Sequence, residues 1–200
     1  MCRRNGASSS VTVYGSLVQV GLPEGDTIGF TKRTATVFDP EVGIEFLKLT
    51  YISTGDSYAM TDEDGNTVLS TRVTGTAAGK YFPTSVTVPG SNQTTTLGWE
   101  KVTVTGKEVV RPTRMLAPVQ DGVNCTTLTR GCRALTFTYA TTTTATGTAE
   151  SAWGDYTGRV KEISFTAWDP DLATPAMRTV PMARYAYDNA GRLREFPPPL

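Results

Sequence analysis

ARYAYDNAGRLREF, residues 183–196, is the last full strand-turn-strand pattern in this sequence. Tyr185 and Tyr187 alternate with small or polar residues, as in a strand with one buried face. Asp188 can accept bonds from backbone N–H groups, and Gly191 permits a positive φ, so the DNAG segment has turn chemistry. The alternation then resumes around Leu193. The stretch therefore predicts a β-hairpin.

The same pattern occurs earlier in the chain. DYTGRVKEI at residues 155–163 aligns with DNAGRLREF at residues 188–196. The aspartate, glycine, arginine and glutamate are identical, and valine replaces leucine, lysine replaces arginine and isoleucine replaces phenylalanine. A single D-x-x-G carries no weight, but two copies with this agreement indicate a repeated hairpin unit.

Residues 185–193, YAYDNAGRL, closely resemble the tyrosine-aspartate repeat of the RHS/YD-repeat family, whose pattern is roughly Y-x-Y-D-x-x-G-R-L. Residues 124–139 and 153–159 also resemble the segment that precedes the repeats in secreted actinobacterial members. The resemblance covers about residues 111–196. The expected repeat-motif residues are Tyr185, Tyr187, Asp188, Gly191, Arg192, Leu193, Asp155, Gly158 and Arg159.

This resemblance implies both a fold and a role. In the family, the repeats coil into a β-sheet spiral that closes into a hollow shell, often around a toxin at the far C-terminus. The chain is then expected to be a secreted, non-enzymatic structural segment that forms or caps such a shell. Its partners would be the rest of the shell or neighbouring protomers. An ion pair of Arg192 or Arg159 with Asp188 or Asp155 would tie the turns.

The composition favours an all-β fold and excludes several functions. Thr, Val, Gly and Ser abound while helix formers are sparse. Lys plus Arg equals Asp plus Glu at 19 each, so nothing indicates binding to nucleic acid or anionic lipid. Histidine is absent, which removes histidine-based catalysis and the usual zinc and iron sites. No cofactor is expected.

The sequence predicts that the chain divides into three parts. Residues 1–10 are polar, without the apolar core of a signal peptide, and are expected to be disordered or added in cloning. Residues 11–110 are expected to form an antiparallel, sandwich-like β domain. Residues 111–200 are expected to form a β-sheet segment with YD-type hairpins, the seam lying at Arg111-Pro112. No apolar stretch approaches the ~20 residues that span a bilayer.

Alternation and turn residues predict the individual strands. Residues 11–14 and 17–20 form either a hairpin or one bent strand, and residues 27–38 form one long strand. Residues 44–52 are expected to be a strand, with a helix over 41–49 as the alternative. Residues 75–83 are expected to form a loop. Further strands are expected at 57–60, 66–73, 85–88, 95–105, 107–110, 133–140, 158–168 and 177–188.

The three cysteines bear on the cellular compartment of the protein. Cys125 and Cys132 are separated by six residues, and Gly131 permits a tight return, so a disulfide can close a small loop. The alternative is two unpaired thiols, and the resemblance to secreted proteins favours the disulfide and an extracellular location. Cys2 is left over near a polar end.

The remaining candidate sites are weaker. Asp62, Asp64 and Asn66 have the spacing of calcium-binding loops, but Val73 stands where a bidentate glutamate is required, so a hairpin turn is favoured. The carboxylate pairs, such as Asp169 with Asp171, lie in turn sequences, and no catalytic motif accompanies them. The alternative function is a carbohydrate- or surface-binding module that uses Trp99, Trp153 and Tyr156.

Overall fold

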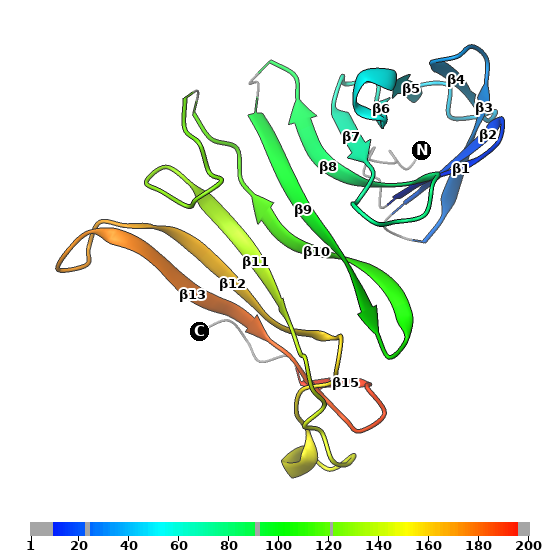
Figure 1. Cartoon of the computed structure of the whole chain (residues 1–200). Helices are drawn as coiled ribbons and strands as arrows, with labels where there is room; N and C mark the ends of the chain where they lie inside the picture. The colour runs from blue at the N-terminus through cyan, green and yellow to red at the C-terminus, as the bar shows by residue number, and fades with distance from the viewer. Residues whose placement is uncertain (1–9, 23–24, 91–92, 121, 196–200) are drawn as a thin grey trace. The chain divides into compact units, whose positions relative to one another are not determined.

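The computed structural model describes residues 10–22, 25–90, 93–120 and 122–195, and their regular secondary structure is almost entirely antiparallel β-strand (Figure 1). This confirms the predicted all-β class. The chain forms two compact units, Met1–Lys101 (unit 1) and Val102–Leu200 (unit 2). The expected seam at Arg111-Pro112 lies instead within a strand of unit 2.

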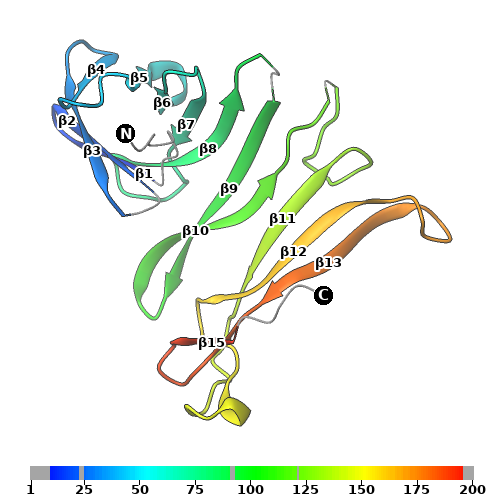
Figure 2. The same cartoon turned by 180° about the vertical axis from the view of Figure 1, so that it is seen from behind.

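Unit 1 contains an eight-stranded antiparallel meander that closes on itself. Sequential strands pair throughout, and β1 also pairs with β8 through Val11 with Tyr81 and Thr12 with Lys80. The ribbon returns to its start in both views (Figures 1 and 2). Its strands are β1 Ser10–Tyr14, β2 Leu17–Gly21, β3 Thr27–Lys32, β4 Val37–Pro40, β5 Lys48–Ile52, β6 Ser57–Thr61, β7 Thr67–Thr71 and β8 Lys80–Val88, with a 3₁₀ turn η1 at Ser53–Gly55.

The core of unit 1 follows from the period-2 alternation of these strands. Buried residues alternate with less buried ones along β2 and the first part of β3, at Val18, Val20, Ile28 and Phe30. Side chains of alternate residues point to one face of a strand, so closing the sheet places this set inside the barrel. Phe30 has no exposed surface. Burial of this apolar set is the main favourable term for the fold of unit 1.

The long strand expected over residues 27–38 is wrong, because the chain reverses within it. The Thr34 hydroxyl accepts the N–H of Thr36 at 3.3 Å and that of Val37 at 3.0 Å. Arg33 N–H donates to the Val37 carbonyl at 3.0 Å. A threonine that bonds its own backbone in this way competes with the strand ladder, so β3 and β4 form a hairpin.

Two other expectations in unit 1 are corrected. The strand expected over residues 44–52 begins only at Lys48. Ile44 and Leu47 are buried from a turn segment, in which Leu47 N–H donates to the Ile44 carbonyl at 3.0 Å. Residues 75–83 are not all loop, because β8 begins at Lys80 and its first residues close the barrel.

Strand β9, Gln93–Val104, pairs with the second half of β8 and crosses the boundary between the units. In unit 2 the sheet runs β10 Lys107–Leu116, β11 Arg133–Tyr139, β12 Val160–Asp169 and β13 Ala176–Arg184. A cross-strand row of half-buried apolar residues runs over it from Met115 through Leu135 and Phe165 to Val180. A 3₁₀ turn, η2, lies at Glu150–Ala152, and a two-stranded sheet joins β14 Ala186–Tyr187 to β15 Leu193–Glu195.

Candidate functional site

The quoted stretch forms the predicted hairpin between β14 and β15. Asp188 N–H donates to the Arg192 carbonyl at 3.0 Å, and Gly191 N–H donates to the Asp188 carbonyl at 2.9 Å. Gly191 has a φ of 74°, in the region that favours glycine. Tyr187 is buried and Tyr185 is half-buried, whereas Leu193 is 52% exposed.

Asp188 is the centre of this turn. Its side chain is fully buried, and its Oδ1 accepts the N–H groups of Ala190 at 2.9 Å and Arg192 at 3.0 Å. Its Oδ2 accepts both Nε and Nη2 of Arg194, at 2.9 Å and 2.8 Å. These bonds, the one from Arg192 first, hold the pKa of the Asp188 carboxyl below its ordinary value despite the opposing effect of burial.

The cation that pairs with the motif aspartate is not the one expected. Arg159 and Arg192 are exposed, and the pairs form instead with the residue six positions after each aspartate. Lys161 Nζ lies 2.7 Å from Asp155 Oδ2, and Arg194 Nη2 lies 2.8 Å from Asp188 Oδ2. The sequence does carry a signal for this pair, because the aligned positions 161 and 194 hold lysine and arginine and so keep a positive charge.

The two copies of the motif pack against each other. Gly154 N–H donates to the Tyr187 carbonyl at 3.0 Å, and Tyr187 N–H donates to the Gly154 carbonyl at 2.8 Å. The Tyr187 hydroxyl donates to the Val160 carbonyl at 2.8 Å. A Cβ on Gly191 would lie 2.9 Å from the Tyr156 ring. We call this contact region the repeat junction; in Figure 2 β15 lies beside the loop that precedes β12.

The first copy has a different local partner. Arg159 N–H closes a turn on the Tyr156 carbonyl at 2.9 Å, and β12 follows directly. The residues before the turn do not pair with β12. Instead, Gly158 N–H donates to the Ala140 carbonyl at 2.8 Å, and Ala140 N–H donates to the Arg159 carbonyl at 2.9 Å. A Cβ on Gly158 would collide with Val104. The hairpin expected for the first copy is therefore not formed, and its turn bond is shifted by one aligned position from the Asp188–Gly191 bond of the second copy. The two copies share the strand that follows, which begins at the aligned residues Val160 and Leu193.

The protonation of Asp188 makes a pH-dependent contribution to the stability of unit 2. Its pKa is lower in the folded chain than in the unfolded chain, so the stabilisation is complete above the ordinary carboxyl range near pH 4. It is lost as the pH falls below that range. Urea unfolding between pH 3 and pH 6 should show this loss, and the Asp188→Asn variant should show a flatter profile over the same interval. Equal slopes for the two proteins would contradict the assignment.

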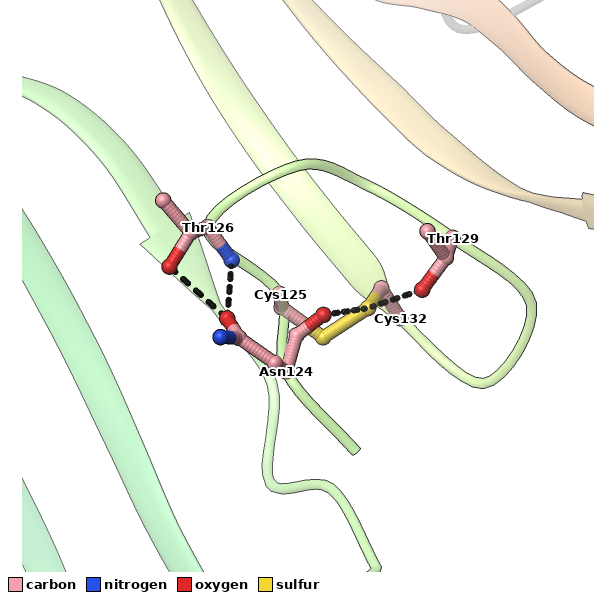
Figure 3. Close-up of a disulfide and its surroundings, with 5 residues drawn as sticks. All are labelled: Asn124, Cys125, Thr126, Thr129 and Cys132. Carbon is pink, nitrogen blue, oxygen red and sulfur yellow. Dashed lines mark hydrogen bonds between the residues drawn. A yellow bond between two sulfur atoms is a disulfide. The ribbon is translucent and has the colours of Figure 1, made fainter. Parts of the chain in front are cut away.

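The disulfide expected between Cys125 and Cys132 is present, with a Cα–Cα distance of 5.7 Å (Figure 3). Both residues are buried. Asn124 Oδ1 accepts the N–H of Thr126 at 2.8 Å and its hydroxyl at 2.7 Å, which fixes the start of the loop. The Thr129 hydroxyl lies 3.7 Å from Cys132 Sγ. Cys2 lies outside the described residues.

Removing this disulfide should destabilise unit 2 moderately. The Cys125→Ala/Cys132→Ala double variant is expected to lose about 2–3 kcal/mol, because the closed loop is short. Denaturant unfolding of the oxidised protein, the reduced protein and the variant measures the effect. The reductant should leave the double variant unchanged. A variant as stable as the oxidised protein would show that the loop is held by its other contacts.

The Asp62–Asn66 region forms the favoured hairpin turn. Asp62 Oδ1 accepts the N–H groups of Asp64 at 3.1 Å and Asn66 at 2.9 Å, and its Oδ2 accepts Asn66 Nδ2 at 2.9 Å. Asp62 is thus committed to the turn between β6 and β7. Asp169 likewise accepts Asp171 N–H at 3.0 Å and Arg178 Nη1 at 3.0 Å. Among the described residues, no group of three potential metal ligands occurs.

The three aromatic residues of the alternative function are each half-buried. Trp99 Nε1 donates to the Pro83 carbonyl at 2.6 Å, and Trp153 Nε1 donates to the Thr148 carbonyl at 3.0 Å. Tyr156 belongs to the repeat junction through its contact with Gly191. These rings are therefore held by internal contacts at one edge or face.

In the part of the chain that the structure describes, none of the helical segments has the length and hydrophobicity of a membrane-spanning helix.

Sequence reasoning did not identify a polar cluster around Asp56 in unit 1. Asp56 Oδ1 accepts the hydroxyls of Tyr81 at 2.8 Å and Tyr51 at 3.1 Å, and its Oδ2 accepts Arg72 Nη1 at 3.3 Å. The Tyr81 bond is the main reason that the pKa of Asp56 lies below its ordinary value. Burial, followed by the bond to Asp56, raises the pKa of Tyr81. The cluster ties the residue after η1 to the strand that closes the barrel.

Comparison of the chain with protein-family models, with curated proteins and with solved structures gave no match.

Proposed function

We propose that this chain is a non-enzymatic structural segment of a secreted YD-repeat protein, in which it forms or caps part of a β-sheet shell. The shell encloses cargo or presents an outer surface, and its other parts are the partners of this segment. The observation that carries the proposal is the repeat junction. Two aligned copies of one motif pack on each other and use the same aspartate–cation pair.

The way the junction is built supports a structural role for its motif residues. Asp188 is satisfied by two backbone N–H groups and a two-point contact with Arg194. Gly191 lies against a ring of the other copy. Units that bury a surface only against their neighbours are typical of repeat architectures.

The hydrogen bonds made by the candidate catalytic carboxylates also favour a structural role for the chain over an enzymatic one. Asp62 and Asp169, each a member of a candidate pair, accept bonds from their own turns. Catalytic carboxylates need access to a substrate across a cleft, and turn-capping side chains are committed elsewhere. The disulfide suits an extracellular protein, because oxidising compartments preserve such bonds.

The alignment gives a direct test. β15 aligns with the first residues of β12, so a further unit should continue from Glu195. We would replace residues 196–200 by a copy of residues 163–195 and compare it with a scrambled copy of equal composition. The proposal expects the native copy to fold: strand content by circular dichroism rises, trypsin resistance extends into the addition, and unfolding stays cooperative. A native copy as sensitive to trypsin as the scrambled one would overturn the repeat assignment.

A further inference from the structure

The outer face of strands β7, β8 and β9 is hollowed by a groove of about 390 Å³ in unit 1. Register explains why side chains meet there. Thr71 pairs with Phe82, and the rings of Phe82 and Trp99 lie 5.3 Å apart between centroids. Tyr81 and Pro83, which flank Phe82 in β8, are buried, so Phe82 points away from the core of the barrel. Trp99 packs on Phe82 and therefore lies on the same outer side.

Trp99 is held so that it offers the groove an apolar surface. Its Nε1 donates to the Pro83 carbonyl at 2.6 Å, which commits the polar edge of the indole and fixes the ring. Thr71 and Thr84 also line the groove, and the Thr84 hydroxyl, which donates to the Leu69 carbonyl at 3.3 Å, can still accept a hydrogen bond. A fixed aromatic ring surrounded by hydroxyls is suited to a ligand with one apolar face and several hydroxyl groups.

The charges of the groove favour a neutral ligand. Arg72, Glu100 and Lys101 contribute both signs to the lining. Arg72 Nη1 already lies 3.3 Å from Asp56 Oδ2, and Lys101 Nζ donates to the Gly75 carbonyl at 2.6 Å. Both cations are therefore engaged. A carboxylate or phosphate ligand would have to compete with these partners and would also face Glu100.

We propose that this groove binds one ring of a neutral carbohydrate, with the apolar face of the sugar against Trp99. The hydroxyls of the sugar would bond to Thr71, Thr84 and the remaining N–H groups of Arg72. The site lies in unit 1 and uses no residue of the repeat junction. It would give the chain a surface-binding role independent of shell formation.

The test uses the whole chain labelled with ¹⁵N and follows the indole N–H signal of Trp99. The probes are methyl glycosides of glucose, galactose, mannose and N-acetylglucosamine, together with their β-1,4-linked trimers where these exist, and glucuronate as the acidic comparison. At least one neutral probe should shift the Trp99 signal saturably. Trp99→Leu should weaken that binding about tenfold, or 1.4 kcal/mol. The matched control, Trp153→Phe in unit 2, should leave it unchanged.

A second variant keeps the test decisive if Trp99→Leu fails to fold. Thr71→Val removes one hydroxyl at nearly constant shape and should weaken binding several-fold while the amide spectrum of the barrel stays the same. Failure of every neutral probe to shift Trp99 would overturn the proposal. It would also be overturned by binding that survives unchanged in the groove variants, or by glucuronate binding more tightly than every neutral probe.

Discussion

Replacing Gly191 with valine is expected to lower the free energy of unfolding of unit 2 by about 3 kcal/mol. Two separate costs add. The residue has a φ of 74°, which a β-branched side chain rejects, and a Cβ would lie 2.9 Å from the Tyr156 ring across the repeat junction. Denaturant unfolding followed by near-ultraviolet circular dichroism measures the loss.

Two variants separate the causes of this effect. Gly106→Val carries the same kind of backbone strain, with a φ of 78°, but nothing lies within 4 Å of its added Cβ. It should therefore cost clearly less than Gly191→Val. Asp188→Asn keeps an oxygen for the backbone N–H groups but turns an amide NH2 toward Arg194, so both bonds from that guanidinium are lost. The Arg194 side chain is 34% exposed and can turn to solvent, so this variant should also cost less than Gly191→Val. Equal losses for Gly191→Val and Asp188→Asn would show that the turn assignment is wrong.

Phe30→Ala should have the largest effect on unit 1, a loss of about 3–5 kcal/mol. Phe30 is fully buried among the side chains inside the barrel, and its removal leaves a cavity that a closed sheet cannot easily collapse. Urea unfolding monitored at unit 1 tyrosine resonances measures the change.

Phe46→Ala provides the matched control, because Phe46 is 36% exposed in the turn segment before β5. It should cost less than about 1 kcal/mol. A similar loss for both substitutions would show that the interior of the barrel is not the main source of stability in unit 1.

Local patterns predicted the hairpins well. The DEDGN segment and the DNAG segment each carry an aspartate that caps backbone N–H groups within a few residues, and both form turns where expected. Such bonds depend on adjacent sequence alone. The disulfide loop belongs to the same class, because Cys125 and Cys132 are separated by a short segment.

What the sequence did not reveal depends on residues far apart. Tyr81 lies between Gly79 and Pro83, which together indicate a loop, yet its pairing with Val11 makes it part of a strand. Nothing near residue 81 signals that partner. Thr34 is the converse case: its neighbours alternate as in one long strand, and its hydroxyl reverses the chain.

The repeat junction was partly predictable. The alignment of the two motif copies identified the turn residues, but their contact through Gly154 and Tyr187 depends on how β12 and β13 bring them together. Arg192 follows the turn glycine directly and was the natural choice of partner for Asp188. Arg192 instead binds the Asp188 carboxylate through its backbone N–H while its side chain is exposed, and the guanidinium that reaches the buried carboxylate is that of Arg194.

The pairing of β1 with β8 has a consequence for the order in which unit 1 folds. Each of the seven hairpin contacts between sequential strands closes a short segment and can form rapidly. The contact between Val11 and Tyr81 closes a far longer segment and carries a larger loss of chain entropy. We therefore expect ring closure to be the late, rate-limiting event. During synthesis, β1 must wait with an unpaired edge until β8 has left the ribosome.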